Sequence, residues 1–331
     1  MVTLNDIQQA ADRLRGISRR TPLVVCPHMH EEHRLWFKPE SLQPIGSFKL
    51  RGAYNKIASL TDEERRRGVI TYSSGNHAQG VAYAARAMQT KAVIVMPRNA
   101  PKVKRDATAA LGAEIVEVGA GSRERQERAE ELARTHGYVI IPPYNDEKII
   151  AGQGTIGLEI LEDCPEVECV LVPIGGGGLI SGVSAAIKQA RPSVKVVGVE
   201  PELANDAQQS FRAGKLVEIT GEQATRTLAD GLRTQSLGAI TFEHVREFVD
   251  DIVTVTEDEI LVAMRKMALN AKLVAEPSGA VTFAAFLFHQ HELPQTRNNI
   301  AVISGGNVEA HLLAEVLSGG KPAAQTSATH P

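Results

Sequence analysis

One lysine stands in a turn where its amine could do chemistry. Lys49 follows residues 41–48, Ser-Leu-Gln-Pro-Ile-Gly-Ser-Phe, a turn rich in Pro and Gly that feeds a predicted helix. An amine attacks an aldehyde only when it is neutral, and a helix N-terminus flanked by Phe48 disfavours the ammonium form. Taken alone, a lysine is most often a solvated surface group. Lys49 is therefore a candidate nucleophile whose role depends on its neighbours.

A second segment places small polar residues at the end of a predicted strand. Residues 69–80 read Val-Ile-Thr-Tyr-Ser-Ser-Gly-Asn-His-Ala-Gln-Gly. Free N–H groups and hydroxyls at the start of the following helix can bind an anion such as a substrate carboxylate. Ser74 and Asn76 are the candidates, although a helix N-cap is the commoner role for these residue types. His77 has no second histidine at ligand spacing, so an ordinary helix-start histidine is favoured over a metal ligand.

Four consecutive glycines form the third segment. Gly175, Gly176, Gly177 and Gly178 follow a buried apolar strand and precede a helix that starts with Leu179. Their N–H groups can converge on a phosphate with no side chain in the way, and the helix dipole adds attraction. The P-loop and dinucleotide patterns are both absent. A flexible hinge is disfavoured because glycine in a strand-to-helix joint costs stability, so the loop predicts a phosphate site.

A fourth segment ends a predicted strand with a hydroxyl. Ser304 lies at the C-terminal tip of residues 300–304 and is followed by Gly-Gly-Asn. Ligands of parallel sheets bind at this edge. A hydroxyl there can hydrogen-bond a ring nitrogen, while a lone serine at a strand end is usually only a cap.

Alternating strands and helices position these segments, which is typical of parallel sheets with crossover helices. The first series has strands at 69–72, 92–96, 114–118 and 139–141, with helices at 81–88, 102–111 and 123–135. The second has strands at 169–173, 194–199, 251–255 and 300–304, and we expect it to include an N-terminal helix at 4–15 and a strand at 35–38. The predicted fold is α/β with two doubly wound, mostly parallel sheet domains. The predicted division is a large domain of residues 1–50 and 145–320, a small domain of residues 51–144, and a flexible tail at 321–331.

Composition indicates a soluble globular protein with a small-molecule partner. The chain has 331 residues, 43% hydrophobic and 23% charged, with a net charge of -3, so neither nucleic acid nor an anionic membrane is favoured. The three cysteines are Cys26, Cys164 and Cys169, too few and odd in number for a disulfide framework. There is neither a signal-peptide pattern nor a run of about 18 apolar residues. We therefore expect a cytoplasmic protein.

Together and in this order, the four segments resemble those of the fold-type II pyridoxal-phosphate enzymes. The resemblance runs from about Thr21 to Asn307 and is closest to the branch of serine/threonine dehydratases and serine racemases. It implies the tryptophan synthase β-like fold, pyridoxal 5'-phosphate as cofactor, and a homo-oligomer, expected to be a dimer.

The resemblance also implies a role for each candidate residue. Lys49 would form the Schiff base with the cofactor, Asn76 would bond its phenolic oxygen, Gly175 to Gly178 with Leu179 would hold its phosphate, and Ser304 would face its pyridine nitrogen. A neutral serine cannot keep that nitrogen protonated as an aspartate would, so the ring should be a weaker electron sink. This favours β-elimination, in which Lys49 takes the α-proton and the β-hydroxyl leaves.

The implied activity is that of an ammonia-lyase acting on a small β-hydroxy amino acid. L-Threonine, L-serine and 3-hydroxyaspartate share the reacting groups, and a 2-oxo acid and ammonia would be the products. Ser74 resembles the residue that exchanges a proton on the opposite face in racemases, so a serine or aspartate-type racemase is the alternative. A catalytically silent binding protein would be expected to lack Lys49 or the glycine loop. Arg123 could neutralise a second substrate carboxylate, although such an arginine is more often a surface charge.

Two departures separate the chain from other branches of the family. Leu50 stands where threonine synthases carry aspartate, and the lysine turn reads Ser-Phe-Lys where cysteine synthases usually show Ser-Val-Lys. Few residues follow Gly306, which leaves no room for the regulatory domain of biosynthetic threonine dehydratases. A catabolic or substrate-shifted enzyme is therefore expected.

An acidic segment resembles the divalent-cation site of the racemase branch. It reads Gly-Val-Glu-Pro-Glu-Leu-Ala-Asn-Asp over residues 198–206. Glu200, Asp206 and the carbonyl of Ala204 would supply hard oxygen ligands for Mg²⁺, Mn²⁺ or Ca²⁺, with waters completing the shell. The alternative is a solvated acidic loop.

Overall fold

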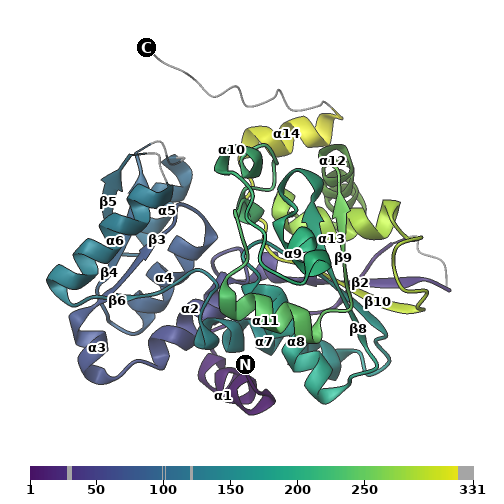
Figure 1. Ribbon diagram of the computed structural model, residues 1–331. Coiled ribbons are helices and arrows are strands. Elements are labelled where there is room, and N and C mark those ends of the chain that lie inside the picture. The colour runs from purple at the N-terminus through teal and green to yellow at the C-terminus, as the bar shows by residue number, and fades with distance from the viewer. Residues whose placement is uncertain (28–31, 99, 101, 120–121, 320–331) are drawn as a thin grey trace.

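Two separate sheets, each with helices on both faces, make up the molecule (Figure 1). The computed structural model describes residues 1–27, 32–98, 100, 102–119 and 122–319, without the side chains of residues 102, 103, 122 and 123. The tail predicted at 321–331 lies outside this range. The α/β fold expected from the alternating pattern is confirmed.

The smaller sheet has four parallel strands in the order β5-β4-β3-β6. Its strands are β3 (Val69–Tyr72), β4 (Ala92–Pro97), β5 (Glu114–Val118) and β6 (Val139–Ile140). The central strands β3 and β4 are almost wholly buried, because helices cover both faces of the sheet and β-branched residues suit such positions.

The larger sheet has six strands in the order β1-β2-β10-β7-β8-β9. Its strands are β1 (Val24–Val25), β2 (Arg34–Pro39), β7 (Cys169–Pro173), β8 (Lys195–Pro201), β9 (Asp251–Val255) and β10 (Asn298–Ile303). Of the strand pairs described in this sheet, β1–β2 alone is antiparallel. Since β2 pairs with β10, the expectation that the N-terminal strand joins the second series is confirmed. The exact domain boundaries stay a prediction.

Helices fill the connections between strands. Before β7 they are α1 (Leu4–Leu14), the 3₁₀ turn η1 (Glu40–Leu42), α2 (Lys49–Ala58), α3 (Asp62–Arg67), α4 (Asn76–Ala87), α5 (Lys102–Ala110), α6 (Ser122–His136) and α7 (Glu147–Asp163). After it they are α8 (Gly178–Ala190), η2 (Glu202–Ala204), α9 (Asp206–Ala213), α10 (Gly221–Ala224), η3 (Asp230–Leu232), α11 (Ala239–Phe248), α12 (Glu257–Lys266), the π-helical turn η4 (Met267–Ala271), α13 (Pro277–Phe288) and α14 (Ala310–Ser318).

One predicted helix boundary is wrong. The helix expected to begin at residue 81 begins at Asn76, because Ala78, Gln79 and Gly80 pack inside its first turns. Gly80 allows this packing, since a Cβ there would lie 3.0 Å from the carbonyl oxygen of Lys49.

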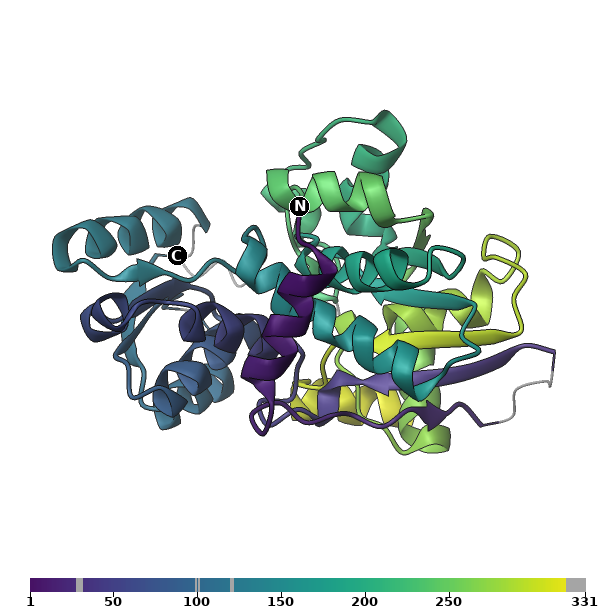
Figure 2. The same cartoon turned by 90° about the horizontal axis from the view of Figure 1, so that it is seen from below.

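The N-terminal helix α1 lies across the middle of the molecule (Figure 2). Its Ile7, Ala10 and Leu14 are buried, and it contacts α2, α7 and α8. Helix α2 also packs on α4 and α7, so it connects the small sheet with the large one. None of the described helices combines the length and apolar character that crossing a membrane requires.

Candidate active site

Lys49 is the first residue of α2, and protein atoms surround its amine. Its Nζ donates a hydrogen bond of 2.7 Å to the carbonyl oxygen of Pro143. Part of the side chain remains accessible to water, yet burial of the ammonium lowers the pKa of Lys49 to about 8. A substantial fraction of the amine is therefore neutral near physiological pH, which nucleophilic attack requires.

The turn before Lys49 is fixed to the end of β10 by backbone hydrogen bonds. Phe48 N donates to Ser304 O at 3.0 Å, and Gly306 N donates to Gly46 O at 2.9 Å. Gly46 has a φ of +71°, a conformation that favours glycine. Lys49 and Ser304, far apart in the sequence, are thereby held in one site.

Asn76 begins α4 at the C-terminal end of β3. Its Nδ2 donates to Glu276 Oε1 at 2.6 Å, and its Oδ1 accepts from Asn307 Nδ2 at 2.8 Å. The N-cap residue of α4 is Gly75, and no side chain caps this helix. The capping role considered for Ser74 and Asn76 is therefore wrong, and the first N–H groups of α4 are not taken up by a side-chain cap.

His77 is buried beside Lys49 and is neutral. Its Nε2 lies 2.9 Å from the carbonyl oxygen of Ile141, and burial together with the charge of Lys49 lowers its pKa to about 3. Among the described residues its Nδ1 has no hydrogen-bond partner. His77 is thus a buried, neutral histidine in the first turn of α4, and the expectation that it binds no metal stays a prediction.

The glycine loop joins β7 to α8 under close packing. Gly177 has a φ of +89°, and a Cβ on it would lie 2.8 Å from Leu237 and Thr241. A Cβ on Gly176 would collide with the Tyr144 ring, and one on Gly175 would lie 3.2 Å from the Gly231 carbonyl oxygen.

The loop therefore leaves its N–H groups uncovered by side chains of its own. Gly178 and Leu179 form the first turn of α8, and no side chain caps that helix either. An uncapped helix start behind consecutive glycines is suited to a phosphate. Because Tyr144 adjoins Pro143, the same segment contacts both the loop and Lys49.

Ser304 lies at the end of β10 and is almost completely buried. Its Oγ donates to the carbonyl oxygen of Ser278 at 3.2 Å. The hydroxyl can rotate to donate elsewhere, since a serine offers one donor and two acceptor positions. The ends of β3, β7 and β10 thus bring together a lysine, a glycine loop, an amide and a serine.

Glu200 and Asp206 form a second, separate group. Both side chains are fully buried, and Glu200 accepts hydrogen bonds from the N–H groups of Ala207 at 3.1 Å and Gln208 at 2.7 Å. Neither carboxylate oxygen of Asp206 has a partner in the described part of the chain. Burial raises the pKa of Asp206 to about 7, and burial and the charge of Asp206 raise that of Glu200.

The alternative of a solvated acidic loop is therefore wrong, since both carboxylates are inside the protein. Ala204, the third predicted ligand residue, is also buried. Within the described residues, no group of three or more His, Cys, Asp or Glu side chains is placed to hold a metal. A cation here would need backbone oxygen and water beside the two carboxylates.

Sequence reasoning missed Glu276 and Asn307, which hold Asn76 from both sides. The signal for Glu276 was an acid directly before Pro277 in an otherwise apolar stretch, and Asn307 is the asparagine that follows Ser304-Gly-Gly. It also missed the ion pair between Lys104 of α5 and Asp230 of η3, which connects the small sheet's helices to the large sheet's. Arg123 lies in α6, but its side chain is outside the described part of the molecule.

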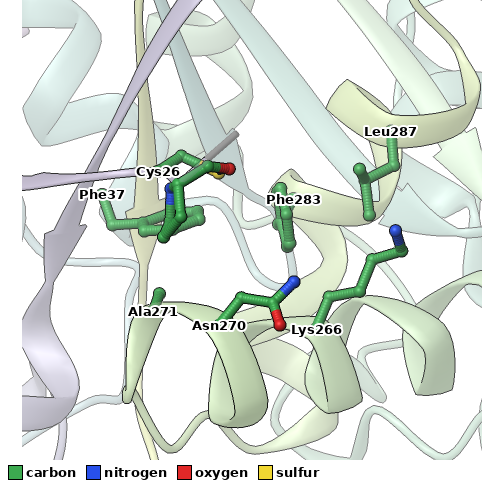
Figure 3. A pocket seen from close by; sticks show the side chains of 8 residues that line it. Cys26, Phe37, Lys266, Asn270, Ala271, Phe283 and Leu287 are labelled. Atoms are coloured by element: carbon green, nitrogen blue, oxygen red, sulfur yellow. The ribbon is translucent and has the colours of Figure 1, made fainter. Parts of the chain in front are cut away.

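A cavity of about 120 Å³ lies elsewhere, among β2, η4 and α13. Figure 3 shows Cys26, Phe37 and Phe283 around it, with Lys266 and Asn270 on the side of α12 and η4. None of the predicted site residues lines this cavity.

Comparisons with known proteins agree with this arrangement. The family described as pyridoxal-phosphate dependent enzyme matches residues 14–305. The L-threo-3-hydroxyaspartate ammonia-lyase of Saccharomyces cerevisiae is 41% identical, covering 96% of this chain and 97% of that protein. The L-threonine ammonia-lyase of Thermotoga maritima is 46% identical, and the match covers 97% of this chain and 79% of that protein. The structure of maize serine racemase superposes with a TM-score of 0.91 at 38% identity, and the match covers 96% of this chain and 97% of that one.

The match extends over nearly the whole chain and includes both sheets and the segments between them. It names the cofactor class that a buried lysine beside a glycine loop had suggested. The chain belongs to the fold-type II family of pyridoxal-phosphate-dependent enzymes.

Proposed function

We propose that this protein is an ammonia-lyase that converts a small β-hydroxy amino acid to a 2-oxo acid and ammonia. The observation that carries the proposal is the buried Lys49 amine, with a pKa lowered to about 8, in one site with the glycine loop. The relatives named above as ammonia-lyases support the reaction class.

The residues of the site fit the cofactor. The N–H groups of Gly175 to Gly178 and Leu179 would hold its phosphate, at a loop where Gly176 and Gly177 have no room for a side chain. Asn76 and Ser304 would hold the phenolic oxygen and the ring nitrogen. Bound pyridoxal phosphate would supply an aldehyde that condenses with amines and a ring that withdraws electrons from the substrate Cα.

Lys49 would act as the base that removes the α-proton. Its amine must be neutral for this step, and burial provides that near pH 8. The carbonyl oxygen of Pro143 accepts an N–H of Lys49 and so holds the amine in place. Loss of the α-proton and the β-hydroxyl gives an enamine of the substrate, which hydrolyses to the 2-oxo acid and ammonia. The uncapped start of α4 would bind the substrate carboxylate.

A racemase is the second candidate, and Ser74 is the observation in its favour. This residue lies in the loop before α4 and is half-buried. Such a hydroxyl can exchange a proton with a substrate carbon. If serine changes chirality and no 2-oxo acid forms, the racemase describes the protein better.

We also propose a divalent cation, Mg²⁺, Mn²⁺ or Ca²⁺, between Glu200 and Asp206. Within the described part of the chain, these two buried carboxylates have raised pKa values and no positive partner, and both oxygens of Asp206 are unpartnered. The carbonyl of Ala204 and waters would complete the shell.

The homodimer and the cytoplasmic location expected from the sequence stay predictions. Light scattering of the purified protein checks whether it is a dimer.

The test combines absorption with product formation. Protein reconstituted with pyridoxal 5'-phosphate should absorb near the visible edge and release 2-oxo acid from L-threonine, L-serine or a 3-hydroxyaspartate isomer. Lys49→Ala should lose both the band and the activity. Lys91→Ala, which removes a half-exposed lysine paired with Glu114, is the matched control and should keep both. A wild-type protein that forms no band would overturn the proposal.

A further inference from the structure

Glu276 lies directly beside the residue expected to contact the cofactor ring. It precedes α13, is almost completely buried, and accepts hydrogen bonds from Asn76 Nδ2 at 2.6 Å and from the backbone N–H of Asn307. A Cβ on Gly305 would collide with Glu276 Oε1, so glycine at this position makes room for the carboxylate. The carboxylate therefore has a fixed place between β10 and α4.

The hydrogen bonds determine which way the Asn76 amide points. Asn307 Nδ2 donates to the carbonyl oxygen of Ile45 at 2.9 Å, and a carbonyl can only accept. The same Nδ2 lies 2.8 Å from Asn76 Oδ1, which must then be the acceptor. Asn76 Nδ2 consequently faces Glu276, and no flipped amide satisfies all three contacts.

One donor of Asn76 remains after these contacts are made. An amide nitrogen carries two hydrogens, of which Glu276 takes one. Within the described residues, the second has no acceptor. It is available to an oxygen that accepts, such as the phenolic oxygen of the cofactor.

We propose that Glu276 is the positioning residue that fixes the Asn76 amide with one N–H directed to the cofactor's phenolic oxygen. The proposal rests on the cofactor placement given under the proposed function. Without the Glu276 carboxylate, the amide would lose the partner that holds its nitrogen on this side. Glu276 would act on the cofactor through its hydrogen bond to Asn76.

A neighbouring ion pair offers a contrast with this hydrogen-bond role. Asp230 and Lys104 lie near Glu276, and the charge of Asp230 contributes, after burial, to raising the pKa of Glu276 to about 7. If Glu276 mattered only as a charge near the cofactor, removing Asp230 would have an effect of similar size. If Glu276 acts through its hydrogen bond to Asn76, Asp230→Asn should hardly change the affinity for the cofactor.

A double-mutant cycle tests the proposal. The dissociation constant of pyridoxal 5'-phosphate and the position of its visible band are measured for wild type, Glu276→Gln, Asn76→Ala and the double variant. Glu276→Gln keeps the shape but turns one acceptor into a donor. We expect each single change to weaken binding about tenfold and shift the band, and the double variant to bind no more weakly than Asn76→Ala. Asp230→Asn should change binding less than twofold.

Two results would contradict the positioning role of Glu276. About a hundredfold loss in the double variant, or an Asp230→Asn effect as large as that of Glu276→Gln, would overturn the positioning role. Should Glu276→Gln fail to fold, Asn307→Ala can replace it, because Asn307 is the other hydrogen-bond partner of the Asn76 amide. Adding Asn307→Ala to Asn76→Ala should then cause no further loss of cofactor affinity. A wild type that binds no cofactor instead overturns the proposed function, so the two failures are distinguishable.

Discussion

Two groups of buried charges in this molecule differ in whether they are neutralised. In the first, the fully buried Arg51 makes paired hydrogen bonds to both oxygens of Glu40 and of Glu159, at 2.6 to 3.0 Å. The fully buried Lys38 adds an ion pair to Glu159 at 2.6 Å. Although burial opposes the charged form, Arg51 lowers the pKa of Glu40. Every charge here has an opposite neighbour.

The second group, as far as the structure describes the chain, holds carboxylates and no cationic side chain. Glu200 and Asp206 are both fully buried, and the pKa of each is raised, by burial in the first place. Buried carboxylates are stable when a cation or hydrogen-bond donors compensate them. Glu200 has two backbone donors, whereas Asp206 has no partner in the described residues.

The difference separates a network whose charges are balanced within the chain from a pair of carboxylates that the described residues leave without a positive partner. The Arg51 group is complete within the chain and ties α2, which begins at Lys49, to η1 and α7. The Glu200–Asp206 group is incomplete and becomes balanced only when protons or a cation enter. We expect the first group to be sensitive to mutation, and the second to be sensitive also to pH between about 4 and 7 and to a divalent cation.

Removing Arg51 should have the largest effect. Arg51→Met leaves the buried Glu40 and the partly buried Glu159 with less positive charge beside them, which should lower the free energy of unfolding by about 3–5 kcal/mol. Urea denaturation followed by circular dichroism measures the change. Arg51→Lys should fall in between, because a lysine keeps the charge but cannot bond both carboxylates bidentately. A loss below about 1 kcal/mol for Arg51→Met would contradict the picture of a closed network.

Changing pH without a cation should have the next largest effect. The pKa of Asp206 is about 7 in the folded protein and about 3.8 when unfolded, so between these values the folded state binds more protons. Stability should therefore fall as pH rises from about 4 to 7, by an amount on the order of a few kcal/mol. Urea unfolding in the presence of a chelator measures the free energy of unfolding across this pH range. Subtracting the values for Asp206→Asn from those for wild type removes the contribution of other titrating groups. Equal pH slopes in both proteins would mean that Asp206 does not carry the raised pKa.

Adding a divalent cation should reverse this penalty. A cation at about 100 times its Kd stabilises the folded state by about 2.7 kcal/mol, and it keeps both carboxylates ionised. Thermal unfolding with Mg²⁺, Mn²⁺ or Ca²⁺, against a chelator, should show a higher Tm in wild type. Glu200→Gln and Asp206→Asn should lose most of the increase. An equal increase in these variants would place the cation elsewhere.

Local features of the fold and the site were predictable, while the partners of each charge were not. The strands have β-branched runs, and the glycine loop and Lys49 turn stand in short segments whose chemistry is local. Glu276 was not predicted because its partner Asn76 lies on another sheet's helix and only the tertiary fold joins them.

Tertiary contacts also decide which of the other charged residues are buried. The sequence of the acidic segment at 198–206 also allows a solvated loop, and only the structure shows that Glu200 and Asp206 are buried. Likewise, nothing in the sequence near Arg51 indicates that Glu40 of η1 and Glu159 of α7 surround its guanidinium. Burial of a charge depends on what packs against it from distant parts of the chain.

The smallest effect is expected at the rim of the Arg51 group. Arg20 pairs with Glu162 at 2.7 Å and with Asp163, and its side chain is 52% exposed. Because water and salt screen such pairs, Arg20→Ala should cost about 1 kcal/mol or less in urea denaturation. In about 1 M NaCl, where the Debye length is about 3 Å, most of that difference should disappear.

Arg20 also tests how far the closed network extends. Asp163 contacts both Arg20 and, at 3.8 Å, the buried Lys38. If the network ends at the buried residues, Arg20→Ala and Arg51→Met should be additive within about 0.5 kcal/mol. A loss above about 2 kcal/mol for Arg20→Ala, unchanged by salt, would instead make Arg20 part of the buried group and extend its cooperative unit to the protein surface.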